Sequence, residues 1–121
     1  MRLKRHVDLI VWQKAIDLAI EVYRVSDMIP REEMYALSDQ MKKTAVSIPS
    51  KIAQGQDSNL AEEYLRCLNH AKGSKGKLET QLLICLRLKY VTVTDIVEAQ
   101  TQLCEVGELI NSIGKELAVA S

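Results

Sequence analysis

The chain has 121 residues, the size of one ordinary domain, and 47% of them are hydrophobic while 26% are charged. This composition excludes the intrinsically disordered class, and two prolines with five glycines are too few turn residues for an all-β sandwich. The sixteen basic and sixteen acidic residues cancel, so the net charge indicates no class of partner. No apolar stretch approaches the ~20 residues of a membrane span. The three cysteines are widely spaced, as expected of buried thiols in a reducing compartment. We therefore expect one domain over residues 1–121, in the cytoplasm and without a membrane.

Hydrophobic periodicity predicts four helices, at about residues 8–27, 30–55, 60–89 and 94–117. In the first helix the apolar side, which includes Trp12, Ile16 and Ile20, covers more than half of the circumference. A helix that lies on one core needs a stripe only somewhat over about 100° wide. The excess predicts a second buried contact for this helix, either deep inside the bundle or between subunits.

Proline and glycine mark the course of the second helix. Pro30 is well placed as its first residue, and Pro49 predicts a bend near residues 45–49, because proline removes one backbone hydrogen bond and displaces the carbonyl four residues earlier. Gly55 is a plausible C-terminal stop.

The third helix is predicted to start at a capping box formed by Asn59 and Glu62. Gly73 and Gly76 lie in its interior, where each costs about 1 kcal/mol relative to alanine, and they predict close helix packing. Lys75 points towards the apolar stripe. Three placements are open for it: at the rim of the core, in an ion pair with Glu79 or an acid of the fourth helix, or at a subunit interface.

The fourth helix is predicted to open at Thr94 and Asp95, after a short β-branched link. Four amphipathic helices with short connections favour an all-α, antiparallel, up-down-up-down four-helix bundle.

Basic residues gather on the predicted second and third helices. Three lysines of the second helix have no acidic residue between Gln40 and Gln56, and the cations of the third helix lie opposite its core. Such a face would bind phosphates without regard to base sequence and with a strong salt dependence. An ordinary solvated helix face is the equally weighted alternative. The candidate nucleic-acid-binding residues are Lys42, Lys43, Lys51, Arg66, His70, Lys77 and Arg87.

Catalytic and metal-binding patterns are not found. A di-iron bundle needs Glu-x-x-His motifs, and neither His6 nor His70 has a glutamate three residues before it. No clustered cysteine and histidine spacing indicates zinc, and no phosphate-binding P-loop is present. We expect no catalytic residue, no metal and no cofactor, and hence no enzyme.

Five ordered segments resemble motifs of one bacterial family of four-helix bundles, the 23S rRNA intervening-sequence proteins. Residues 9–15 resemble L-x-V-W-x-K-A, residues 33–40 resemble E-x-Y-G-L-x-x-Q, and residues 47–55 resemble S-I-P-S-N-I-A-E-G. Residues 71–74 and 78–82 resemble A-R-G-S and L-E-T-Q-L, and Tyr23 with Ile29-Pro30 fits the Y…P between the first two motifs. The resemblance covers roughly residues 8–117.

The resemblance implies a bundle that assembles into a ring-like homopentamer without enzymatic activity. A related branch contains the accessory variability determinants of diversity-generating retroelements, which are basic pentamers that bind a reverse transcriptase and nucleic acid. This chain departs from the motifs at Lys51 for Asn, Gln54 for Glu, Ala36 for Gly, and Lys75 at a normally uncharged position. These changes add positive charge and move the chain towards the basic branch.

The leading hypothesis is therefore a non-enzymatic homo-oligomer that binds RNA, DNA or a nucleic-acid-handling protein such as a retroelement reverse transcriptase through its basic face. The alternative is a structural or protein-interaction scaffold with no affinity for nucleic acid.

Overall fold

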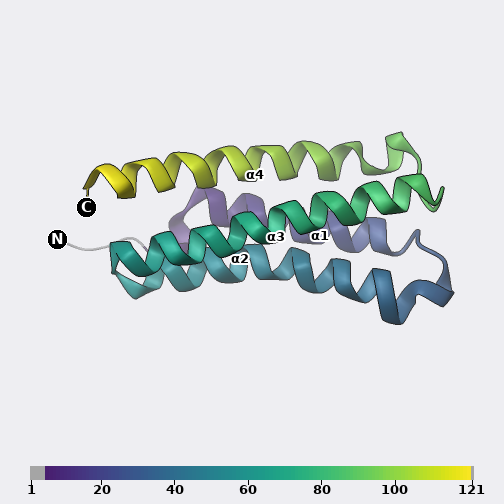
Figure 1. Cartoon of the computed structure of the whole chain (residues 1–121), viewed down its shortest axis with the longest axis horizontal. Helices are drawn as coiled ribbons and strands as arrows, with labels where there is room; N and C mark the ends of the chain where they lie inside the picture. Colours follow the sequence, from purple (N-terminus) through teal and green to yellow (C-terminus); the bar gives the residue numbers. More distant parts are fainter. Residues whose placement is uncertain (1–4, 121) are drawn as a thin grey trace.

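The computed structural model describes residues 5–120 and contains four long helices along one axis (Figure 1). No β-strand occurs in this range, which confirms the all-α prediction and its four helices. Residues 1–4 and 121 of the predicted domain lie outside the described residues. In chain order the elements are η1 (His6–Asp8), α1 (Ile10–Ser26), η2 (Arg31–Glu33), η3 (Met34–Ser38), α2 (Asp39–Ser58), α3 (Ala61–Arg87) and α4 (Val93–Ala120).

Each long helix returns along the one before it, as the colours of Figure 1 show. The Lys14–Glu105 and Arg24–Asp95 hydrogen bonds join α1 to α4 in this reversed sense. Both α1 and α3 pack against α2 and α4, so the α1/α2 and α3/α4 contacts lie on opposite sides of the bundle. All four helices supply fully buried side chains to the core, among them Leu18, Ile48, Leu82 and Leu103.

The second long helix starts and ends differently from the prediction. A 3₁₀ turn (η2) and a π-helical turn (η3) precede α2, so Pro30 lies just before the first of these turns. Pro49 is buried inside α2 without ending it, and the helix continues past Gly55 to Ser58. Asn59 adopts a left-handed conformation at the end of α2, with a φ of 59°. The predictions of Gly55 as a stop and of Asn59 as an N-cap were therefore wrong.

The glycines serve different purposes from those expected. A Cβ atom at Gly73 or Gly76 would meet nothing within 4 Å, so the predicted close packing there was wrong. Close packing occurs instead at Gly55, where a Cβ would lie 2.9 Å from Cβ of Cys67. At Gly107 the aliphatic part of Lys75 occupies the space that a Cβ would need.

Lys75 adopts one of the three placements left open. Its ammonium lies 2.5 Å from a carboxylate oxygen of Glu79, one turn further along α3, and its aliphatic chain covers Gly107 of α4. A partly buried lysine thus uses its stem for packing while its charge is paired at the surface.

Candidate functional site

The relative position of α2 and α3 is fixed by short polar contacts along the line where they meet. The Ser47 and Ser74 hydroxyls form a hydrogen bond, with their Oγ atoms 2.7 Å apart, near the middle of both helices. Gln81 Nε2 donates to Thr44 Oγ1 at 3.3 Å further along the same line. Because the two helices run in opposite directions, residues earlier in α2 lie beside residues later in α3.

This pairing places basic residues of the two helices near each other. Lys51 and His70 each lie four residues from the serine pair, about 6 Å along the axis, and are therefore level. Lys43 lies four residues from the pair in the other direction and comes within about one turn of Lys77. We call the cluster formed by Lys43, Lys51, Arg66, His70 and Lys77 the basic strip.

Two cations of the basic strip have acidic partners on their own helix. Lys43 Nζ lies 3.1 Å from Asp39, and the guanidinium of Arg66 binds both carboxylate oxygens of Glu63. Hydrogen bonds from Arg66 and Cys67, together with the charges of Arg66 and Lys51, hold the pKa of Glu63 below its ordinary value despite some desolvation. Exposed ion pairs of this kind contribute only about 0.2–1 kcal/mol, so a phosphate can displace the carboxylates.

The two remaining predicted residues lie elsewhere. The ammonium of Lys42 lies over the ring of Tyr23, 5.2 Å from its centroid, and therefore belongs to the α1/α2 side. Arg87 is the last residue of α3, ten residues or about 15 Å beyond Lys77. The structure thus groups Lys43, Lys51, His70 and Lys77, with Arg66 one turn before His70 on α3, and leaves Lys42 and Arg87 apart.

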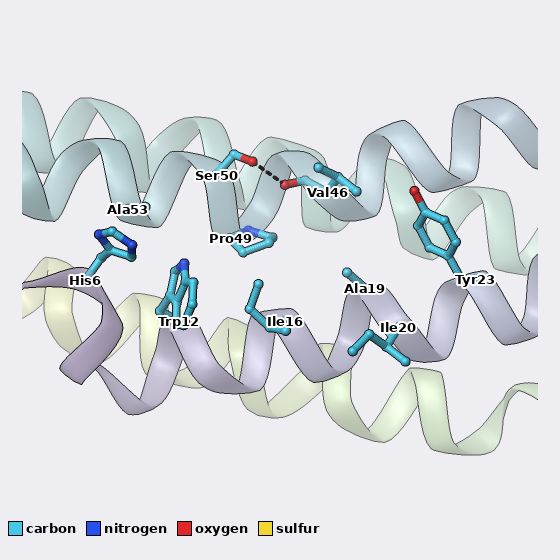
Figure 2. A pocket seen from close by; sticks show the side chains of 10 residues that line it. All are labelled: His6, Trp12, Ile16, Ala19, Ile20, Tyr23, Val46, Pro49, Ser50 and Ala53. Carbon is cyan, nitrogen blue, oxygen red and sulfur yellow. Dashed lines mark hydrogen bonds between the residues drawn. The ribbon is translucent and has the colours of Figure 1, made fainter.

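An apolar groove lies between α1 and α2, with a volume of about 610 Å³ (Figure 2). Its α1 wall includes Ile20, which is 65% exposed although it is a large aliphatic residue. Contiguous exposed apolar surface rimmed by polar groups is typical of an interaction site. The groove residues are His6, Trp12, Ile16, Ala19, Ile20, Tyr23, Val46, Pro49, Ser50 and Ala53.

One end of the apolar groove is closed by the N-terminal segment. His6 Nδ1 lies 2.6 Å from Asp57 Oδ2, and the His6 backbone N–H donates to Asp57 Oδ1 at 3.2 Å. The His6 ring also contacts the edge of Trp12, with centroids 5.0 Å apart. These contacts tie η1 to the last turn of α2. They join residues far apart in the sequence, and no local motif identified them.

Acidification is expected to release this segment. Partial burial of Asp57 opposes its ionisation, but hydrogen bonds from the side chain and backbone of His6 outweigh it, so the pKa of Asp57 lies below its ordinary value. Such a group stabilises the fold above its unfolded pKa of about 3.9 and loses this contribution as the pH falls through the folded value. Trp12, the only tryptophan, should report the release as a fluorescence change below about pH 4. Asp57→Asn should remove that pH dependence, and an unchanged titration in this variant would contradict the assignment.

The hydroxyl and metal-ligand chemistry of the described residues is limited. Ser50 Oγ donates to the Val46 carbonyl, and Ser47 Oγ donates to the Thr44 carbonyl while accepting from the Ser74 hydroxyl. Within residues 5–120, no three histidine, cysteine, aspartate or glutamate side chains are placed to hold a metal ion together. In the same range, every helix is too short or too polar to cross a lipid bilayer.

Two comparisons with known proteins give matches. A family model described as "23S rRNA-intervening sequence protein" matches residues 7–112. The fold is similar to the 1.70 Å crystal structure of a protein of unknown function from the S23 ribosomal protein family of Bacteroides thetaiotaomicron. The TM-score is 0.80 at 20% identity, covering 88% of this chain and 99% of the other. No curated protein matches the chain.

Proposed function

The chain belongs to the family of 23S rRNA-intervening sequence proteins, and on this premise we propose that it is a non-enzymatic, homo-oligomeric bundle that binds nucleic acid through its basic strip. The observation that carries the proposal is the alignment of Lys51 with His70 and of Lys43 with Lys77 across the contact between α2 and α3. Two helices thus offer their cations on one surface.

The shape of the neighbouring surface also suits a polyanion. Gly73 and Gly76 on α3 have no side chain, and the space that a Cβ would occupy at each is open among the described residues, so a sugar-phosphate chain can approach the helix backbone closely. Lysine ammonium groups on flexible stems bind phosphates as point charges, without reading base sequence. Binding to RNA or DNA of any sequence, with strong salt dependence, is the expected mode.

Assembly into a homo-oligomer is supported by the apolar groove. Burying Trp12, Ile20 and Tyr23 against another subunit removes apolar surface from water, at about 25 cal/mol per Å². A ring, such as the pentamer that the family resemblance implies, repeats the basic strip once per subunit. Repetition converts weak single contacts into a multivalent surface. Docking of a reverse transcriptase on this surface is a special case of the same proposal.

The second candidate function is a scaffold that binds only protein. It is favoured by the pairing of Lys43 with Asp39 and of Arg66 with Glu63, which offsets two of the charges in the basic strip. In that case the apolar groove is the functional surface, and the basic strip is an ordinary solvent-exposed helix face.

Salt-dependent binding distinguishes the two functions. We expect Lys51→Gln with Lys77→Gln to weaken binding to a single-stranded RNA and to a DNA duplex. The slope of log K against log salt should become shallower by about 1.4 for RNA and about 1.8 for DNA, since two phosphate contacts are lost. Fluorescence anisotropy from low to physiological salt measures this slope.

The matched control carries the same charge change outside the basic strip, at Lys89→Gln with Lys115→Gln. An equal loss in this control would show that only net charge matters. If the wild-type protein binds neither nucleic acid at low salt, the scaffold is the correct function.

A further inference from the structure

A small cavity of about 160 Å³ lies where the chain passes from α1 to α2. It is separate from the basic strip and is well below the roughly 300–1,000 Å³ of a pocket for a drug-sized ligand. At about 30 Å³ per water molecule it holds a handful of waters, or one small polar group. The residues around it are Ser26, Asp27, Ile29, Pro30, Arg31, Met34, Ser38 and Lys42.

The charges around this cavity favour an anion. Arg31 and Lys42 contribute two positive charges against the single negative charge of Asp27. The ammonium of Lys42 lies over the face of the Tyr23 ring. This contact uses no hydrogen-bond acceptor, so the N–H groups of Lys42 can still donate to a ligand. The backbone carbonyls at the end of α1, which would repel an anion, already accept N–H groups of the turn at 2.9–3.2 Å.

A buried hydroxyl without a partner gives independent evidence of a ligand. Ser26 is only 3% exposed, and its Oγ makes no hydrogen bond within the described chain. Leaving such a group unpaired costs about 1–3 kcal/mol. The neighbouring Ser38 hydroxyl has only a marginal acceptor, the Ser26 carbonyl at 3.5 Å. Both hydroxyls are therefore able to donate to a ligand oxygen.

We propose that this cavity binds one phosphate group, with Arg31 and Lys42 balancing its charge and the Ser26 and Ser38 hydroxyls donating to its oxygens. Arginine matches the oxygens of phosphate in geometry, and the small volume suits a group of that size. The phosphate is either a free ion or part of a nucleic-acid backbone. The second source rests on the proposed function. It is compatible with the fold because Lys42, which lines the cavity, directly precedes Lys43 of the basic strip.

Calorimetric titration with inorganic phosphate in a phosphate-free buffer tests the site. Ser26→Ala and Arg31→Gln should each weaken phosphate binding by at least about fivefold, which is roughly one hydrogen bond. Asp27→Asn should strengthen it by removing the opposing charge. Arg87→Gln is the matched control, because Arg87 does not line the cavity.

Thermal unfolding separates a binding role of Ser26 from a structural one. Without phosphate, Ser26→Ala should melt at or above the wild-type temperature, since it deletes an unpartnered buried hydroxyl. With phosphate, the wild type should gain in melting temperature more than the variant. No binding by the wild type at millimolar phosphate, or equal binding by both site variants, would overturn the proposal.

Competition with a single-stranded RNA identifies the source of the phosphate. Displacement of inorganic phosphate by RNA supports a backbone phosphate at the site, and binding of both together supports a free ion. The Lys51→Gln, Lys77→Gln protein should retain inorganic phosphate binding. Failure of the basic strip to bind nucleic acid is therefore distinguishable from failure of this cavity to bind phosphate.

Discussion

Ile20→Glu is expected to dissociate the proposed homo-oligomer, raising the dissociation constant between subunits by at least about 30-fold. Ile20 lines the apolar groove and is 65% exposed in the single chain, so the substitution leaves the core of the bundle intact. In the proposed assembly the same position would be buried, where an unpaired carboxylate is costly. Loss of a central interface contact costs about 2 kcal/mol or more, which corresponds to the stated factor. Light scattering after size exclusion, over a range of protein concentrations, measures it.

Ile10→Glu provides a closely matched control. Ile10 lies on the same helix and is 63% exposed, but it does not line the apolar groove. The Ile10 variant should keep the subunit number of the wild type. Dissociation by both substitutions would place the interface on another part of α1, and a monomeric wild-type protein would contradict assembly altogether.

The fold was predictable because its helices are amphipathic throughout. The apolar stripes of α2, α3 and α4 read from the sequence are the buried faces of the structure, with Ile48, Leu82 and Leu103 at their centres. Periodicity of this kind depends only on residues three or four apart, so it survives without knowledge of the tertiary structure. The excess apolar width of α1 was also informative, since it corresponds to the wall of the apolar groove.

Glycine and capping signals failed where tertiary packing decides. Gly55 has the sequence character of a helix stop, but a neighbouring helix needs its missing side chain, and α2 continues. Asparagine can end a helix in a left-handed conformation, and it can also cap the start of the next helix. Asn59 lies between two helices and takes the first role, at the end of α2. Local rules cannot choose between such alternatives.

The candidate site was predictable only in part. A helical wheel places Arg66, His70 and Lys77 on one face of α3, but it cannot show that α2 brings Lys51 beside them. Nor can it show that Lys42 contacts Tyr23 of α1 and therefore lies on the side of α2 away from α3. Long-range contacts such as the Ser47–Ser74 hydrogen bond determine which helices are neighbours and which of their residues lie side by side.

Alanine at Gly55 is expected to destabilise the bundle, whereas alanine at Gly73 and Gly76 should stabilise it. At Gly55 the added Cβ would lie 2.9 Å from Cβ of Cys67 and 3.2 Å from Cα of Tyr64, so α2 and α3 must move apart. Overpacking costs about 1–3 kcal/mol, which is partly offset by the roughly 1 kcal/mol that alanine gains over glycine within a helix. The free energy of unfolding should therefore fall by up to about 2 kcal/mol, as measured by urea denaturation at fixed protein concentration.

Gly73→Ala with Gly76→Ala meets no obstacle, and the free energy of unfolding should rise by about 1–2 kcal/mol. Within residues 5–120 these two glycines weaken an exposed helix without a packing benefit, which is consistent with a role in binding. If a nucleic acid approaches the backbone there, the double variant should bind it more weakly while unfolding at higher urea. Equal binding with raised stability would mean that the polyanion contacts only the side chains of the basic strip, and a loss of stability would show that α3 is packed against something at these positions.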